Sequence, residues 1–274
     1  MNTTQIKNIL SDLGSRAKHS LGQHFLLDES VVTRMVKAGD IGERDTILEI
    51  GPGLGILTKE LTKSPAQKII ACEKDNLIFE FLQKQVKQKN LTLVNRDALV
   101  LIPALKVSLP LKVISNLPYN ISSPVIISLL TVCPVLPEKM ILMVQKEVAQ
   151  RLTAKPGDSN RGILTVFTQL FGEVRVLENL TPEQFYPPPQ VDSAVILIDK
   201  IKMPKVDRKS AFRIIKMAFA KKRKKLKNSL FSSMQISGKR MEDICSKVGI
   251  SADLRPEDLD SQQWFLLISE LVQV

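Results

Sequence analysis

The stretch TILEIGPGLGILTKEL, residues 46–61, passes from an apolar run into a helix-like segment through three closely spaced glycines. Thr46–Ile50 has the composition of a buried strand, and a helix is expected from Gly55 to Lys63. Glycine takes up positive φ and lets the backbone approach a neighbour without a Cβ clash. The glycine spacing differs from the dinucleotide-binding fingerprint, which has two residues before its third glycine. The stretch therefore predicts either a tight strand-to-helix turn or a loop that lies against a ligand.

Strand-like and helix-like segments alternate around this stretch. Further strands are expected at residues 68–72, 91–95, 111–115 and 140–144, and further helices at 29–38, 75–87 and 123–132. Such an alternation is typical of a mostly parallel sheet with helices on both faces. The sequence therefore predicts an α/β fold for the larger part of the chain.

The last third of the chain follows a different pattern. Two strand-like runs, Val174–Leu180 and Val191–Ile198, flank the segment FYPPP and predict a β-hairpin at one edge of the sheet. Only helical segments follow, near residues 209–220, 222–234, 239–247 and 261–272. We therefore expect a flexible N-terminal arm over residues 1–21, an α/β domain over 22–203 and a small all-helical domain over 204–274.

The net charge of +11 is concentrated in one segment. Between Lys202 and Arg240, fourteen lysines and arginines accompany one acid, Asp207, so this segment carries +13. Such a charge indicates a polyanionic partner, either nucleic acid or an anionic membrane. Six of the seven residues 221–227 are basic, which fits a solvated face or a phosphate-binding surface. Apolar neighbours favour a packed helix and hence RNA phosphate binding: Ala218, Phe219, Leu226, Leu230 and Phe231.

Cysteine and histidine usage gives no sign of a metal site. Cys72, Cys133 and Cys245 lie far apart, and the two histidines complete no zinc-ligand spacing. The longest apolar stretch, residues 125–136, is short for a membrane span and contains Pro134. The N-terminus lacks the apolar region of a signal peptide. We therefore expect a monomeric cytoplasmic protein with reduced cysteines, no metal and no membrane association.

Two acids follow neighbouring predicted strands. Glu73 ends the second strand, and Asp97 lies just past the third. Open α/β sheets bind ligands at the carboxyl ends of their strands, where one carboxylate can accept from ribose hydroxyls and another from an adenine amine. The alternatives are a solvated acid for Glu73 and a helix N-cap for Asp97. Together with the glycine loop, the two acids predict a site for an adenosyl group.

The stretch VISNLPYNISSP, residues 113–124, ends the fourth strand with Asn116, Leu117, Pro118 and Tyr119. An amide oxygen and a backbone carbonyl that accept both N–H bonds of an aromatic amine free its lone pair. They also stabilise the positive charge that develops during alkylation. A tyrosine ring can stack on the base, and proline fixes the direction of the loop. The stretch predicts a clamp for an exocyclic amine, the alternative being a turn with a buried tyrosine.

These motifs together resemble those of a known family. The chain is similar to the adenine-amine methyltransferases that use S-adenosylmethionine, and most closely to the KsgA/RsmA family of small-subunit rRNA adenine dimethyltransferases. The segments that carry the resemblance are GQHFLLD (22–28), EIGPGLG (49–55), NLPYNIS (116–122), QKEVAQRL (145–152), FYPPPQVDSAV (185–195) and the basic KKRKKLKNSL (221–230). The resemblance covers nearly the whole chain and implies a Rossmann-like methyltransferase sheet with S-adenosylmethionine as cofactor.

The resemblance also assigns roles to residues. It implies cofactor contacts at His24, Leu26, Gly51, Gly53, Glu73, Asp97 and Asn116. It implies a catalytic loop of Asn116, Leu117, Pro118 and Tyr119, with Phe185 as a second ring that stacks on the target base. It implies RNA contacts at Lys221, Lys222, Arg223, Lys224, Lys225 and Lys227. The family usually has asparagine at the position of His24, which is therefore either a cofactor contact or a packed ring without a ligand role.

The implied function is methylation of the exocyclic amines of two adjacent adenosines near the 3′ end of small-subunit rRNA, with the assembling small ribosomal subunit as partner. An Erm-type enzyme that modifies large-subunit rRNA shares the catalytic loop and is one alternative. Another is a non-catalytic ribosome-assembly factor that binds RNA, which the intact site residues argue against. An NAD oxidoreductase is disfavoured because the fingerprint spacing is absent and the basic segment would be unexplained.

Overall fold

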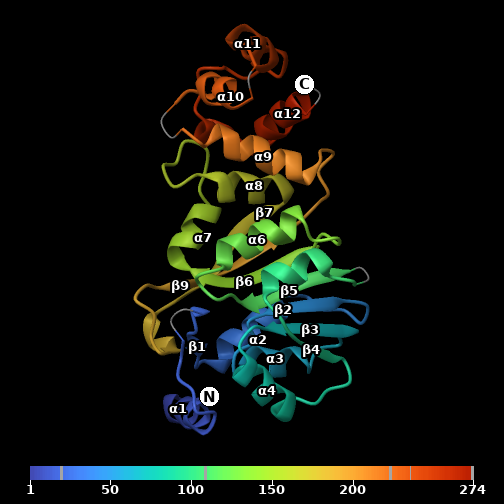
Figure 1. The fold of residues 1–274 in the computed structure, drawn as a ribbon, viewed down its shortest axis with the longest axis vertical. Coiled ribbons are helices and arrows are strands. Elements are labelled where there is room, and N and C mark those ends of the chain that lie inside the picture. The colour runs from blue at the N-terminus through green and yellow to red at the C-terminus, as the bar shows by residue number, and fades with distance from the viewer. Residues whose placement is uncertain (19–20, 108–109, 222–223, 235, 273–274) are drawn as a thin grey trace.

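The computed structural model describes residues 1–18, 21–107, 110–221, 224–234 and 236–272. Figure 1 shows an elongated molecule with the N-terminal helix at one end, a sheet in the middle and the C-terminal helices at the other end. Every helix in the described ranges is too short or too polar to cross a lipid bilayer. Lys222 and Arg223, two of the predicted RNA contacts, lie outside the described residues.

The central sheet has seven strands in the described part of the chain, in the order β4-β3-β2-β5-β6-β9-β7. The strands are β2 (Thr46–Ile50), β3 (Lys68–Glu73), β4 (Leu91–Asn95), β5 (Leu111–Asn116), β6 (Lys139–Gln145), β7 (Glu173–Leu180) and β9 (Ser193–Asp199). The first five in the spatial order are parallel, whereas β9 is antiparallel to β6 and β7. The predicted mostly parallel sheet with a β-hairpin edge is therefore confirmed.

Helices cover both faces of this sheet. They are α2 (Glu29–Ala38), α3 (Ile56–Leu61), α4 (Asn76–Gln85), α5 (Ala98–Leu101), α6 (Ser122–Thr131), α7 (Lys146–Leu152) and α8 (Ile163–Phe171). Alternate residues of a strand point to opposite faces. Accordingly, Ile47 packs in a cluster with residues of α2 and α3, whereas Leu48 packs in one with residues of α6 and α8. Helices α7 and α8 are not among the predicted elements.

The N-terminal segment packs against the sheet domain. α1 (Thr3–Asp12) begins at a capping box, and its Ile6 and Leu10 are buried in a cluster with the first residue of β1 (Phe25–Leu26). β1 pairs antiparallel with β8 (Phe185–Tyr186) in a small separate sheet. A packed helix thus occupies the segment that was expected to be a flexible arm. The division of the chain at residues 21 and 203 stays a prediction.

The C-terminal helices continue the core of the sheet domain. They are α9 (Arg208–Ala218), α10 (Leu226–Met234), α11 (Gly238–Lys247) and α12 (Ser261–Leu271). One hydrophobic cluster runs from the sheet through α6 and α8 into these helices, and the Phe219 ring stacks on Trp264 at 6.2 Å. The buried Arg161 guanidinium donates to the carbonyls of Ala154 (2.9 Å) and Leu259 (3.1 Å). The hydrogen bond to Leu259 thus ties the segment before α12 to the segment between α7 and α8.

Trp264→Ala tests how much the protein depends on this shared core. The Trp264 side chain is fully buried, and truncation of such a ring to alanine leaves a cavity that costs about 3–5 kcal/mol. Urea denaturation should show this loss in the free energy of unfolding. The control is Leu266→Ala on the same helix, where the side chain is 38% exposed and little change is expected. Equal effects of the two substitutions would contradict the packing described.

Candidate active site

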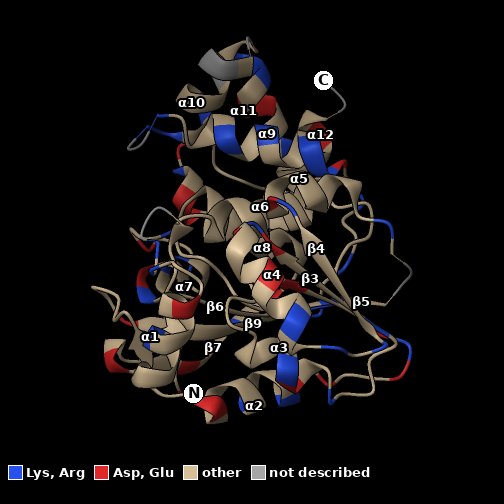
Figure 2. Cartoon of the chain, turned by 60° about the horizontal axis from the view of Figure 1, so that its bottom comes forward, with Lys and Arg blue, Asp and Glu red and all other residues tan. Residues whose placement is uncertain are grey.

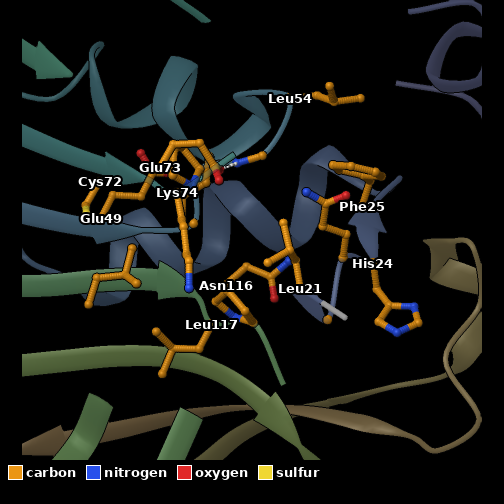
Figure 3. Close-up of a pocket in the computed structure, with 18 of the residues that line it drawn as sticks. Leu21, His24, Phe25, Glu49, Leu54, Cys72, Glu73, Lys74, Asn116 and Leu117 are labelled. Atoms are coloured by element: carbon orange, nitrogen blue, oxygen red, sulfur yellow. Dashed lines mark hydrogen bonds between the residues drawn. The ribbon is translucent and has the colours of Figure 1, made fainter. Parts of the chain in front are cut away.

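A pocket lies at the carboxyl ends of the parallel strands (Figure 3). The glycine loop after β2, the ends of β3 and β5, the loop after β4 and the segment that leads into β1 form its walls. The predicted site residues that line it are His24, Leu26, Gly51, Gly53, Glu73, Asp97, Asn116, Leu117, Pro118 and Tyr119. Phe185 is the predicted site residue of this region that does not line the pocket among the described residues.

The glycine loop lies tightly against the Asn116–Tyr119 loop. Gly51 and Gly53 have φ angles of 68° and 55°, which disfavour any other residue. A Cβ placed on Gly51 would lie 2.9 Å from the Pro118 ring, so a side chain would force the two loops apart. The absence of a side chain at Gly51 therefore lets the two protein segments approach each other. Gly51 also lines the pocket.

Glu73 is held rigidly at the end of β3. Its Oε1 accepts a hydrogen bond from the Asp75 amide at 2.8 Å, and its Oε2 accepts from the Gly53 amide at 3.3 Å. Burial raises the pKa of Glu73 above its ordinary value. Asp75 also accepts from Lys18 at 2.8 Å, which joins the N-terminal segment to the same wall. Glu73 is thus an oriented, buried carboxyl rather than the solvated acid that was the alternative.

Asp97 combines the two roles that the sequence left open. Its carboxylate caps α5 by accepting from the Leu99 amide at 2.9 Å, and it also lines the pocket. The Lys74 ammonium donates to it at 2.8 Å and lowers the pKa of Asp97. The N-cap is therefore real, and it leaves an ionised carboxylate at the pocket wall.

The Asn116–Tyr119 loop, predicted to be catalytic, is fixed at both ends. Asn116 is the last residue of β5, and the Leu117 amide donates to the Met143 carbonyl at 3.1 Å. The Tyr119 hydroxyl forms a hydrogen bond with the Ser193 hydroxyl at the start of β9, and burial raises the pKa of Tyr119. These contacts hold the main chain of the loop and the Tyr119 ring at one edge of the pocket, where Asn116 also lies.

The His24 ring packs between two loops. It stacks on Tyr119, with ring centroids 5.2 Å apart and an angle of 23° between the planes. Its Nδ1 donates to the Pro187 carbonyl at 2.7 Å. The side chain is therefore a packed ring at the rim of the pocket, which agrees with the alternative that His24 packs without a ligand role. A cofactor contact of His24 stays a prediction.

Phe185 lies in a different place from the one that base stacking needs. Its side chain is only 2% exposed and belongs to a cluster with Leu26 and Val195 beneath the β1–β8 pair. The ring would have to be uncovered before a base could stack on it. Its role as a second stacking face stays a prediction, and the ring found against Tyr119 is that of His24.

Glu49, which is not among the predicted site residues, also lines the pocket. Its side chain is 1% exposed, and both carboxyl oxygens lack a hydrogen-bond partner among the described residues. Burial raises the pKa of Glu49 to about 8, with the Thr58 hydroxyl opposing the shift and the nearby Glu73 carboxyl adding to it. The signal was available, because strand alternation places residue 49 on the same buried face as Ile47.

The described part of the basic run lies mostly before α10. Among the described residues of the run, Lys221, Lys224 and Lys225 precede α10, whereas Lys227 lies inside it. Lys221 and Lys224 are exposed, while Lys225 and Lys227 pair with Asp253 at 3.2 and 3.1 Å. Figure 2 shows basic residues on α9 and the segment before α10. The predicted packed helix therefore begins later than expected, because the apolar stripe fixes its face and not its first residue.

The described residues contain no group of three or more His, Cys, Asp and Glu side chains placed to hold a metal ion. Cys72, Cys133 and Cys245 are buried and free.

A family model described as ribosomal RNA adenine dimethylase matches residues 14–273. The chain belongs to this family. A protein named ribosomal RNA small subunit methyltransferase A from Clostridium botulinum is 35% identical over 96% of each chain. A protein of the same name from Caldanaerobacter subterraneus is 36% identical over 93% of this chain and 97% of its own length.

Two solved structures share the fold over most of the chain. A dimethyladenosine transferase from Plasmodium falciparum has a TM-score of 0.75 and 26% identity, covering 91% of this chain and 98% of that one. The 23S rRNA methyltransferase ErmE has a TM-score of 0.68 and 25% identity, covering 91% of this chain and all of the other. The predicted Rossmann-like methyltransferase fold is therefore confirmed.

Membership of the ribosomal RNA adenine dimethylase family implies the use of S-adenosylmethionine, and the pocket has the features that such a cofactor requires. Oriented carboxyls at Glu73 and Asp97 can accept from hydroxyl and amine donors. Gly51 and Gly53 line the pocket at positive φ, so the main chain of the loop can approach a ligand there. The residues that line the pocket therefore fit S-adenosylmethionine.

The raised pKa of Glu49 predicts that Glu49→Gln increases the free energy of unfolding relative to the wild type, and increases it more at higher pH. The ordinary carboxyl value is 4.5, so between roughly 4.5 and 8 the unfolded chain binds fewer protons than the native one. The native protein therefore loses up to about 1.4 kcal/mol of stability per pH unit as pH rises through this window. Thermal unfolding should show Glu49→Gln gaining on the wild type between pH 5.5 and pH 8.5. Glu43→Gln, at an exposed site, should show no such trend.

Proposed function

We propose that this protein transfers methyl groups from S-adenosylmethionine to the exocyclic amines of adenosines in small-subunit ribosomal RNA. The observation that carries the proposal is the meeting of the Glu73 and Asp97 carboxyls with the Asn116–Tyr119 loop in one pocket. The family match over residues 14–273 supports the reaction class, and the curated relatives support the small subunit. The finer choice of two adjacent adenosines near the 3′ end rests on the resemblance of the motifs.

The pocket residues divide the work of holding the cofactor, which supplies an electrophilic methyl group when bound. Glu73 accepts from the ribose hydroxyls, and its two backbone hydrogen bonds hold the carboxyl in position before the ligand enters. Asp97 accepts from the adenine amine. Gly51 and Gly53 let the ligand lie against the main chain, while His24 and Leu26 close the rim.

The Asn116–Tyr119 loop acts on the target amine. The Asn116 amide oxygen and a loop carbonyl accept the two N–H bonds, which turns the nitrogen lone pair toward the methyl group. They also stabilise the positive charge that forms on the nitrogen. Tyr119, held by its bond to Ser193, supports the base by stacking. Since an adenine in a duplex is not accessible, the base leaves its stack to enter the pocket.

The basic run and its neighbours in the C-terminal helices bind RNA phosphates. Lys221 and Lys224 are exposed, whereas Lys225 and Lys227 must exchange Asp253 for phosphate. Lys222 and Arg223 belong to the same proposal from the sequence. The substrate is then the rRNA of the assembling small subunit in the cytoplasm, and the protein acts as a monomer.

Methylation of large-subunit rRNA by an Erm-type enzyme is the second candidate function, because ErmE shares the fold at a TM-score of 0.68. The small-subunit reading is preferred since relatives with that name are 35–36% identical over at least 93% of the chain. A purely structural assembly factor would have no use for oriented carboxyls beside the Asn116–Tyr119 loop. Mapping of dimethylated adenines in both ribosomal RNAs separates these readings.

Asn116→Ala tests the amine clamp. Loss of a group that stabilises transition-state charge typically costs roughly 10²–10³-fold in turnover, while RNA binding by the basic segment should persist. Two methyls on the amine block its pairing edge, so primer extension on small-subunit RNA stops at the product. Asn160→Ala, in an exposed loop, is the matched control and should give full stops. Wild-type stops with folded Asn116→Ala would refute the clamp.

Neutralisation of Lys221 and Lys224 tests the RNA surface. Each lost phosphate contact should reduce the slope of log affinity against log salt by about 1, without a change in cofactor binding. Lys63→Gln on the sheet domain removes an exposed lysine far from this surface and should leave the slope unchanged. Titration of RNA at several salt concentrations gives the slopes. An unchanged slope in the double variant would make the run a solvated segment only.

A further inference from the structure

Glu49 is a buried carboxyl that the mechanism above does not use. It lies on β2 at the wall of the pocket, on the strand face that carries Ile47 and packs under α3 (Figure 3). Its side chain is 1% exposed, and neither carboxyl oxygen has a hydrogen-bond partner among the described residues. A core residue at this position would ordinarily be apolar. The buried carboxyl therefore indicates a ligand with which it interacts.

The surroundings of Glu49 favour its neutral form while no ligand is bound. An ionised carboxylate without hydrogen bonds is costly in an apolar site. The groups that act on it in the described residues are the Thr58 hydroxyl from α3 and the Glu73 carboxyl from β3, and no lysine or arginine is among them. Lys74, the ammonium at the same pocket, is paired with Asp97. Burial accordingly raises the pKa of Glu49 to about 8.

A positively charged ligand would reverse this balance. S-adenosylmethionine carries a sulfonium charge that its product S-adenosylhomocysteine lacks, while both keep the same amino-acid and adenosine groups. An added positive charge in a pocket of low dielectric favours the ionised form of a nearby carboxyl. The two ligands therefore differ in the one property to which Glu49 responds.

We propose that Glu49 loses its proton when the sulfonium cofactor enters the pocket and regains one when the product forms, so that it selects the methyl donor over the spent cofactor. This inference rests on the proposed function. Glu49 is here a specificity-determining residue of the cofactor site and not the base that deprotonates the amine.

The charges and atoms balance through the reaction. The methyl–sulfur bond breaks with its electron pair left on sulfur, which becomes neutral, and a nitrogen–carbon bond forms on the amine. The amine releases one proton to solvent. The Glu49 carboxylate, no longer opposite a positive charge, takes up one proton from solvent and returns to its starting form. The product is then held less tightly than the donor.

Calorimetry measures the proton directly. Binding of each ligand at pH 7 is followed in two buffers with different heats of ionisation, which reports the protons released. For the wild type, S-adenosylmethionine should release close to one proton more than S-adenosylhomocysteine. This difference should vanish in Glu49→Gln, which retains any titration of the ligands themselves. The measurement on the wild type stands even where the variant does not fold.

The affinities give a second readout. Glu49→Gln should lower the preference for donor over product by about tenfold at pH 7, because most of the carboxyl that is protonated in the free protein is ionised beside the sulfonium charge. The wild-type preference should increase from pH 6.5 to pH 8.5, and the variant's should stay flat. Asp97→Asn is the matched control, since it removes an ionised carboxylate of the same pocket and should weaken both ligands alike.

The outcomes are distinguishable. Equal proton release for both ligands, or an unchanged preference in folded Glu49→Gln, overturns the role of Glu49 while leaving the proposed function intact. Failure of the wild type to bind S-adenosylmethionine at all overturns the proposed function instead.

Discussion

The parallel pairing of β2, β3, β4 and β5 is the constraint on which the rest of the structure depends. Parallel strands place all their carboxyl ends at one edge, so groups separated by tens of residues in the chain become neighbours. The register sets Glu73 of β3 opposite Asn95 of β4, and Leu48 of β2 opposite Val113 of β5. The glycine loop, two carboxyls and the Asn116 loop meet for this reason. The pocket is a consequence of strand direction before it is a consequence of any one side chain.

Most of this arrangement could be predicted because its signals are local. Apolar runs closed by glycine, acid or asparagine located the five parallel strands to within about two residues at each end. The order of polar residues at the strand ends located the pocket. Asp97 shows how two local readings can both hold, since one carboxylate caps a helix and lines the pocket at once.

What could not be predicted depends on contacts distant in sequence. Two-residue strands such as β1 and β8 have no periodicity to detect, so the pairing that covers Phe185 was invisible. The segment of α8 is rich in β-branched residues, and its helix is stabilised by packing against α6 and α9 rather than by propensity. The start of α10 was placed too early because its apolar stripe continues into the preceding turn. The packing of α1 depends on Phe25 and on the sheet domain, which its own residues do not reveal.

The core cluster that runs from the sheet through α8 into α12 has a geometric consequence. Packed side chains, together with the hydrogen bonds of the buried Arg161, set the separation between the basic segment and the pocket. The basic segment and the pocket are therefore held at a fixed distance from each other by one shared core. Under the proposed function, an RNA bound by its phosphates at the basic segment can place a nucleotide in the pocket only where the RNA's own fold spans the distance between the two sites. Selection of the target then comes partly from the shape of the RNA, even where no side chain reads its bases.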